Sequence, residues 1–190
     1  MADKVELNLE RTLPELAYYE EHEIFSKSEI NDIIKTRKTH EYTIVAPSAK
    51  RADYIRAILY EQELERQMVK NKSEDTHSAL DFSIRRRIFH LYDRLVQRYP
   101  SIHLYKDYIH YLLKCNSMLK YGQIIQHCLH CYPHCLDFWM IAGFTELDIR
   151  GSVEGSRAIF LQAIRCNPDN PDFYLAMMEF EIRLKHKIDM

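Results

Sequence analysis

The feature that most constrains the fold is an internal repeat of helical segments that end at regularly spaced prolines. Pro100, Pro133 and Pro168 each follow a segment whose apolar residues recur every three or four positions, and the prolines lie 33 and 35 residues apart. That spacing of apolar residues is typical of an amphipathic α-helix. Proline lacks an amide N–H and its ring clashes with the preceding turn, so each proline is expected to end its helix.

A second type of helical segment alternates with the first and carries aromatic or small apolar residues three positions apart. Its copies begin near Tyr54, Tyr105, Trp139 and Tyr174, and the last three of these are 34 and 35 residues apart. A period of about 34 residues with two helices per unit is the signature of an α-solenoid. One hairpin cannot bury its own apolar stripe, whereas stacked neighbours bury it for each other. We therefore predict an all-α solenoid of helix hairpins.

The repeat register also predicts which side chains pack between helices. They are Tyr54, Tyr60, Phe89, Tyr105, Tyr108, Trp139, Ala142, Ala158, Phe160, Ala163, Tyr174 and Phe180. The alternative for the aromatic residues at 105, 108, 111 and 139 is stacking on nucleic-acid bases. A core position is favoured, most strongly for Trp139, because these rings lie where the helices of a repeat meet.

Residues 1–50 do not follow the repeat and are predicted to form an N-terminal helical capping segment, ahead of repeats over 51–190. Within it we expect helices over 5–25, interrupted at Pro14, and over 27–38. Ser26-Lys-Ser-Glu29 matches a capping box, in which the serine hydroxyl accepts a backbone N–H and the glutamate bonds back. The polar stretch 70–78 is expected to be the loop inside the first hairpin.

The last helical segment, at 174–184, corresponds to the first helix of a hairpin, and the chain ends at Met190 without a second one. Solenoids usually finish with a polar capping element. We therefore expect a truncated array, with the apolar face of the last helix left open.

Charge and composition argue against several classes of protein. The net charge is −2 with histidine neutral, whereas proteins that bind bare nucleic acid usually carry a basic excess. No apolar run approaches the roughly 18 residues of a membrane-spanning helix, and the acidic start does not resemble a secretory signal. The five cysteines are therefore expected to be reduced thiols of an intracellular protein.

No catalytic motif occurs, since a P-loop, GxGxxG, H-E-x-x-H and G-x-S-x-G are all missing. We expect no enzyme, no cofactor and no small-molecule substrate. The sharpest alternative is a zinc module, because cysteine and histidine at short spacings are zinc ligands. Its candidate ligands are Cys128, Cys131, His134 and Cys135. The repeat register argues against it, since Cys128 aligns with Leu95 and Ala163 and is expected to be buried.

Arg85, Arg86, Arg94 and Arg98 make one helical segment basic, and they are candidate contacts to RNA or to a partner. Guanidinium groups are well suited to phosphate oxygens. Consecutive arginines point to different faces of a helix, whereas Arg94 and Arg98 are four apart and share a face. The alternative is a solvated face that forms ion pairs with acidic neighbours.

The two-helix pattern resembles HAT (half-a-TPR) repeats, which occur in RNA-processing proteins and read W-x-x-Y-x-x-F-E, then A-R-x-I-F-x-x-A-L-x-x-x-P. The best agreement is the run Arg157-Ala-Ile159-Phe160-Leu-Gln-Ala163-Ile164, which continues to Pro168. Weaker copies are Ile88-Phe89 and Ile124-Ile125.

The N-terminal segment carries a more specific resemblance. Its blocks are Arg11-Thr-Leu13-Pro14-Glu15-Leu16, Ile24-Phe25-Ser26, Glu29-Ile30-x-x-Ile33-Ile34-Lys35, His40-Glu41-Tyr42 and Asp53-Tyr54-Ile55. They resemble the family of the HAT-repeat subunit six of the UTP-B complex, a small nucleolar RNA-associated protein of the small-subunit processome. The resemblance covers essentially the whole chain, but only the N-terminal third of a typical family member.

This resemblance implies a scaffold that helps to assemble the small-subunit processome on nascent pre-rRNA in the nucleolus, and so supports 18S rRNA maturation. It implies two kinds of partner: the β-propeller proteins of the UTP-B complex and the small nucleolar RNP. Direct contact with RNA is left open. The alternative keeps the HAT repeats but places them in mRNA splicing or 3′-end processing, and the block at 13–16 argues for the nucleolar role.

Overall fold

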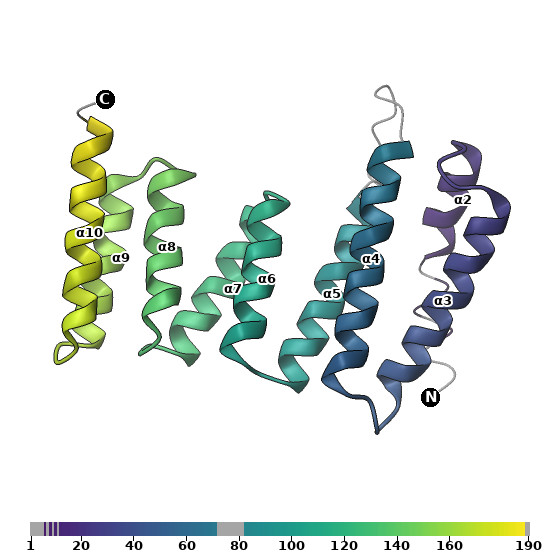
Figure 1. Cartoon of the computed structure of the whole chain (residues 1–190), viewed down its shortest axis with the longest axis horizontal. Coiled ribbons are helices and arrows are strands. Elements are labelled where there is room, and N and C mark those ends of the chain that lie inside the picture. The colour runs from purple at the N-terminus through teal and green to yellow at the C-terminus, as the bar shows by residue number, and fades with distance from the viewer. Residues whose placement is uncertain (1–5, 7, 9, 11, 72–81, 189–190) are drawn as a thin grey trace. The chain divides into compact units, whose positions relative to one another are not determined.

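The computed structural model describes residues 12–71 and 82–188, together with residues 6, 8 and 10 (Figure 1). Among these residues there are helices and no strand, which confirms the predicted all-α class. None of the described helices combines the length and the hydropathy that a membrane crossing requires. The chain divides into two compact units, Met1–Ser101 and Ile102–Met190. The predicted boundary after residue 50 therefore falls inside unit 1.

Unit 1 contains α2 (Leu13–Glu21), α3 (Lys27–Val45), α4 (Arg51–Asn71) and α5 (Ser83–Arg98). Each of these helices packs against the next one in the chain. Pro14 lies in the first turn of α2, where an amide N–H has no intrahelical partner. Residues 6, 8 and 10 are helical and Thr12 lies in a turn, so the helical segment is interrupted just before Pro14, as the sequence predicted.

The ends of α3 and α4 also differ from the prediction. Helix α3 continues to Val45, past the predicted end at residue 38. Residues 70 and 71 belong to helix α4, although they were predicted to begin the loop at 70–78. The remaining residues of that predicted loop, 72–78, lie outside the described residues.

The predicted capping box at the start of α3 is confirmed in both of its bonds. The Glu29 backbone N–H donates to Ser26 Oγ at 3.3 Å, and the Ser26 backbone N–H donates to Glu29 Oε2 at 2.8 Å. The Ser26 hydroxyl also donates to Glu29 Oε2 at 2.8 Å, and the two bonds donated to the carboxylate, chiefly the one from the backbone N–H, lower the pKa of Glu29. The cap fixes the point at which the chain turns from α2 into α3.

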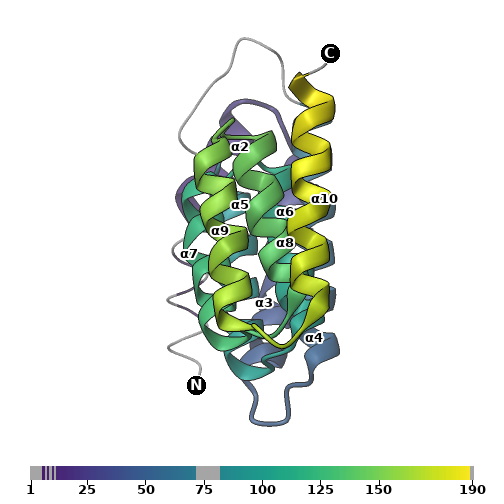
Figure 2. The same ribbon diagram turned by 90° about the vertical axis from the view of Figure 1, so that its left-hand side faces the viewer.

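Unit 2 contains α6 (Ile102–Lys114), α7 (Met118–Cys131), α8 (Leu136–Asp148), α9 (Val153–Cys166) and α10 (Pro171–Ile188). Successive helices pack on each other, and α10 contacts both α8 and α9, which run alongside it in Figure 2. The largest fully buried side chains at the centre of the unit are aromatic. They are Tyr108, Phe138, Phe160, Phe173 and Phe180.

Three turns with nearly the same backbone conformation follow α5, α7 and α9. Each of these helices ends two residues before Pro100, Pro133 or Pro168, as the sequence predicted. The intervening residues are Tyr99 (φ −132°, ψ 68°), Tyr132 (φ −130°, ψ 58°) and Asn167 (φ −139°, ψ 58°). A residue before proline is forced away from the helical region. The sequence repeat is therefore also a repeat of local structure.

Helices α8 and α9 approach closely at Gly143. A Cβ atom built on this glycine would lie 2.4 Å from Cε2 of the buried Phe160 ring. The buried Ser156 hydroxyl donates a hydrogen bond to the Gly143 carbonyl at 2.8 Å. The small residue on α8 thus makes room for the large residue on α9.

Candidate interaction surfaces

Most side chains predicted to pack between helices lie inside the protein. Eight of them are buried: Tyr54, Tyr105, Tyr108, Trp139, Ala142, Phe160, Ala163 and Phe180. Tyr60 and Phe89 are half-buried. Burial of Tyr105, Tyr108 and Trp139, and also of Tyr111, leaves their ring faces unable to stack on a base in this structure.

Two of the predicted packing residues, Ala158 and Tyr174, are exposed instead. On α9 the inward face carries Ser156, Phe160 and Ala163, and residue 158 lies on the opposite side of that helix. On α10 the buried aromatic residue is Phe173, one position earlier than the repeat register predicted. The Tyr174 ring stays 44% exposed, and its hydroxyl donates to the Pro168 carbonyl at 3.1 Å.

Trp139 contacts the turn at Pro133 and residues of α9 and α10. Its indole N–H donates to the Pro133 carbonyl at 2.8 Å, and its ring packs against Ala163 and Phe173. The Asn167 amide donates to the same carbonyl at 3.0 Å. One proline turn is thus bonded both to the helix that follows it and to the next proline turn along the chain.

An ionic cluster links α2, α3, α4 and α5 in unit 1. Arg37 on α3 donates to both carboxylate oxygens of Glu61 on α4, at 2.8 and 2.9 Å, and to Glu15 on α2, at 3.1 Å. From α5, Arg87 donates to Glu61 at 2.8 Å, and Arg94 donates to Glu41 on α3 at 3.0 Å. The members of the ionic cluster are Glu15, Arg37, Glu41, Glu61, Arg87 and Arg94.

Arg37 and Glu61, at the centre of the ionic cluster, are both buried, and their charged forms are both favoured. Burial alone would raise the pKa of the Glu61 carboxyl, but Arg37 and Arg87 outweigh that effect and hold the pKa below its ordinary value. Burial also disfavours the charged form of Arg37, yet Glu61 and Glu15 keep the pKa of this guanidinium above its ordinary value. Each charge therefore depends on its partners, because an isolated ion would be costly in this environment.

The burial and ion pairing of Arg37, Glu41 and Glu61 were not predicted, although the sequence contains a signal for them. The buried side of α3 carries Ile30, Ile33, Arg37, Glu41 and Ile44, which follow one helical stripe. The charged residues at 37 and 41 thus occupy positions where an amphipathic helix places apolar side chains. Opposite charges at such positions in neighbouring helices indicate buried pairing.

The four arginines predicted as contacts for RNA or a partner all belong to α5. Arg85 pairs with Glu65, Arg94 pairs with Glu41, and Arg98 donates to the Pro47 carbonyl at 2.8 Å. Arg86 is exposed. The pairs formed by Arg85 and Arg94 agree with the alternative of a face neutralised by acidic neighbours, and RNA contact at these residues stays a prediction.

The candidate zinc ligands do not come together. The Cys128 thiol is fully buried, and burial raises its pKa to about 12, which disfavours the thiolate that binds zinc. Cys131 is exposed beside His127, with Sγ 3.6 Å from Nε2, and the His134 ring bonds to the Asn167 side chain. In the parts of the chain that the structure describes, no three His, Cys, Asp or Glu residues are placed to hold a metal ion.

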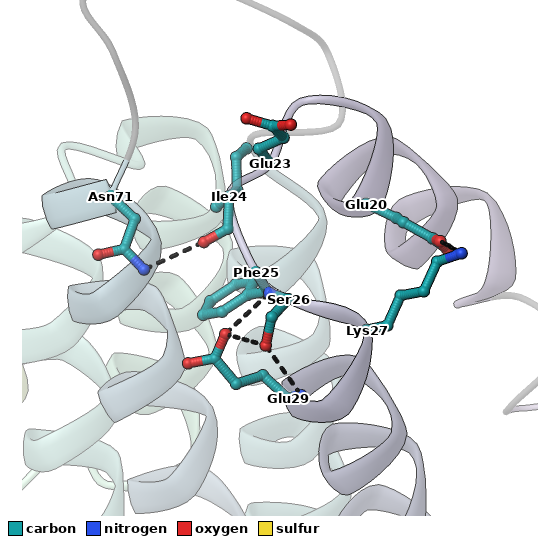
Figure 3. A pocket seen from close by; sticks show the side chains of 8 residues that line it. All are labelled: Glu20, Glu23, Ile24, Phe25, Ser26, Lys27, Glu29 and Asn71. Carbon is teal, nitrogen blue, oxygen red and sulfur yellow. Dashed lines mark hydrogen bonds and ion pairs between the residues drawn. The ribbon is translucent and has the colours of Figure 1, made fainter.

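A surface groove with an apolar base lies between α3 and α4. Its cavity of about 180 Å³ has Phe25, Ile33 and Leu64 at its base and Tyr60 on one side. A shallower depression of about 760 Å³ shares Phe25 and Glu29 with it and extends to Glu20 and Glu23 (Figure 3). We refer to the two together as the α3–α4 groove.

The chain around Phe25 is fixed to the end of α4. The Asn71 amide donates to the Ile24 carbonyl at 3.0 Å, and Figure 3 shows this bond directly beside the Phe25 ring. On the other side of the turn, Lys27 and Glu20 form an exposed ion pair at 3.2 Å. The α3–α4 groove thus has a rigid base, although its rim is open to solvent.

Comparison with known proteins gives one consistent match. The family model described as U3 small nucleolar RNA-associated protein 6 matches residues 9–87. Over 99% of its length, the chain is 30% identical to U3 small nucleolar RNA-associated protein 6 of Schizosaccharomyces pombe and 25% identical to the homolog in Homo sapiens. The aligned region makes up 40% and 32% of those two relatives, so the chain spans less than half of their length. The chain is thus similar to U3 small nucleolar RNA-associated protein 6 along nearly its whole extent.

Proposed function

We propose that this chain is a helical scaffold of the small-subunit processome and supports nucleolar pre-rRNA processing and 18S rRNA maturation. The observation that carries the proposal is its 30% identity, over 99% of the chain, to a protein named for its association with U3 small nucleolar RNA. The repeated helix hairpins add support, because such arrays serve mainly as binding surfaces. In this role the chain is not an enzyme.

We further propose that the hairpins α4–α5, α6–α7 and α8–α9 are HAT-like repeats of one solenoid. The nearly identical turns before Pro100, Pro133 and Pro168 support this, since each closes a hairpin at the same point. In this arrangement α10 is the first helix of the next hairpin and corresponds to α8, with an offset of 35 residues.

The open face of α10 supports the same arrangement. On α8, Trp139, Gly143 and Leu147 are covered by residues of α9. The residues 35 positions later on α10 are Tyr174, Met178 and Ile182, and they are 44%, 60% and 56% exposed. We infer that a further helix, equivalent to α9, covers this stripe in the working assembly. Exposed apolar stripes of this kind mark interaction surfaces.

The partners proposed for the scaffold are the β-propeller proteins of the UTP-B complex and the small nucleolar RNP. Protein contacts are favoured over contacts to bare RNA, since the net charge of −2 gives no general attraction for phosphate. The ion pairs of Arg85 and Arg94 reduce the basic character of α5 further.

The function can be tested by expressing the tagged chain in Schizosaccharomyces pombe and purifying it with its bound partners. We expect U3 RNA to be enriched over spliceosomal RNAs, and the β-propeller partners to remain after nuclease treatment. Enrichment of spliceosomal RNA instead would reject the nucleolar role and favour the splicing alternative. Microscopy of the same tagged chain should show nucleolar signal.

Substitution of the open stripe tests the array. We expect the double variant Met178→Lys/Ile182→Lys to co-purify with much less of the assembly than the wild type, because burying two charges under a covering helix is costly. Leu119 on α7 is 84% exposed, so Leu119→Lys is the matched control and should have no effect. Equal recovery with both variants would contradict the proposed covering helix.

A further inference from the structure

The α3–α4 groove combines an apolar base with an acidic rim. Phe25, Ile33 and Leu64 are each 5% exposed or less, so they form a firm base that an incoming side chain can touch. The cavity above them is about 180 Å³ and has room for one large side chain. The exposed carboxylates of Glu29, Asp32 and Glu63 line this cavity, and those of Glu20, Glu23 and Glu29 line the adjoining depression. Lys27 is the single cation in the two linings.

Several of these carboxylates have little neutralising charge beside them. Within the described residues, neither Glu23 nor Asp32 forms an ion pair. The pair of Glu63 with Arg66 is exposed on both sides, and pairs of this kind are weak. The groove therefore carries a local negative potential that a cationic partner would neutralise.

We propose that the α3–α4 groove is a docking site for a basic amphipathic protein segment. One apolar side chain of that segment would occupy the cavity over Phe25, Ile33 and Leu64. Lysine or arginine side chains next to it would pair with Glu23, Asp32 and Glu63. Charge complementarity selects this partner, because an apolar anchor provides contact area and the flanking charges provide orientation and specificity.

The same charges argue against RNA at this groove. Phosphates attract Lys and Arg, and a protein that binds a strand must neutralise several of them. Here carboxylates would face the phosphates instead. The charges of the α3–α4 groove therefore favour a protein partner, and any contact with nucleic acid would use a different surface. This inference does not depend on the processome role, because it rests on the groove alone.

Peptide binding to the whole chain tests the proposal. The probe is a fluorescein-labelled helical peptide of leucine and lysine, and binding is followed by fluorescence anisotropy at several salt concentrations. The groove variant is Glu23→Lys/Asp32→Lys/Glu63→Lys. The control variant, Asp107→Lys/Glu154→Lys/Asp169→Lys, makes the same change in net charge at exposed carboxylates of unit 2.

We expect the groove variant to weaken peptide binding about tenfold and the control variant by about twofold or less, because exposed charge pairs contribute modestly and add together. Binding should weaken with salt. A peptide with serine in place of leucine should lose affinity for the wild-type chain, since the cavity would stay empty.

Amide NMR shifts of the wild-type chain give a second measurement that needs no variant. Changes caused by the peptide should centre on residues 29–33 and 60–67. Equal weakening by the groove and control variants, or shifts centred elsewhere, would overturn the proposal. Oligouridine that binds the groove and displaces the peptide would identify RNA as the ligand and would also overturn it.

Discussion

Both units of the chain are built from helices that pack against their neighbours in sequence, but they differ in what lies between the helices. In unit 1 the buried residues include Glu15, Arg37, Glu41 and Glu61. In unit 2 the buried polar residues are neutral, and the largest side chains at its centre are aromatic. Among the described residues, all buried charges thus belong to unit 1. The helices of unit 1 are therefore linked by buried ion pairs, whereas those of unit 2 meet around aromatic rings.

This difference matters because the two kinds of contact respond differently to change. A buried ion pair is weak evidence for net stability, but loss of one partner leaves an uncompensated charge and is costly. A close-packed aromatic core responds to volume, because neither a void nor an extra methyl group is easily accommodated. Unit 1 should therefore be sensitive to charge and pH, and unit 2 to side-chain size.

The largest effect is expected for Arg37→Met, which removes the centre of the ionic cluster. Glu15 would lose its ion pair, and Glu61 would keep only its ion pair with Arg87. We expect the free energy of unfolding to fall by about 3–5 kcal/mol, because a buried carboxylate is left unpaired. Urea unfolding at neutral pH measures the loss.

Arg56→Met is the control for this prediction. Arg56 pairs with Asp53 at 2.9 Å, but its side chain is 71% exposed. Its loss should cost less than about 1 kcal/mol, since solvent screens exposed pairs. Similar losses for the two variants would show that burial of the ionic cluster has no energetic consequence.

The second prediction concerns pH and Glu61. The folded-state pKa of Glu61 lies below its ordinary value, so its contribution is fully present above the unfolded-state pKa and is lost as the pH falls through the folded-state pKa. At pH 7, Glu61→Gln should cost about 2–3 kcal/mol through its weakened bonds to Arg37 and Arg87. The difference from the wild type should shrink as the pH falls below about 4.

Unfolding free energies of both proteins across this pH range provide the measurement. Hydrogen exchange at low pH adds a test by region, since amides of unit 1 should lose protection before those of unit 2. A difference between wild type and variant that is constant with pH would mean that the charge of Glu61 does not matter.

The parts of the fold that could be predicted from sequence are those that local chemistry decides. Pro100, Pro133 and Pro168 mark helix ends because the proline ring acts on its own neighbours, and these three ends were predicted correctly. The capping box at Ser26 and Glu29 was also predicted, because both partners lie within four residues.

The parts that sequence reasoning missed depend on partners far apart in the chain. Helix α3 extends past its predicted end at residue 38. Arg37 and Glu41 interrupt its apolar stripe, and only their pairing with α4 and α5 shows that they are core residues. Phe173 and Tyr174 are adjacent aromatic residues, and packing on α8 and α9 decides which of them is buried. The α3–α4 groove was missed because it joins residues from two helices.

The third prediction tests the volume sensitivity of unit 2. Gly143→Ala places a methyl group 2.4 Å from the Phe160 ring, which is 1% exposed and packs against the rings of Phe144 and Phe180. We expect a net loss of about 1–2 kcal/mol, because overpacking outweighs the better helix propensity of alanine.

Gly122 on α7 is the matched control for Gly143. Nothing lies within 4 Å of a Cβ atom built there, so Gly122→Ala should stabilise the protein by about 0.5–1 kcal/mol. Thermal unfolding of the two variants should therefore shift in opposite directions. A gain in stability for both would show that the α8–α9 contact is loose.

The smallest effect compares two helix caps, one in each unit. Ser26 caps α3 with the reciprocal bond from Glu29, whereas Ser152 caps α9 and accepts only from the Gly155 N–H at 3.1 Å. Ser26→Ala should cost about 1 kcal/mol, and Ser152→Ala about 0.5 kcal/mol. Both serines lie outside the ionic cluster and the aromatic core, so the difference should persist at every pH at which Glu29 is charged. If the two losses were equal, the return bond of Glu29 would add nothing to the cap, and the contrast between the units would be confined to their buried residues.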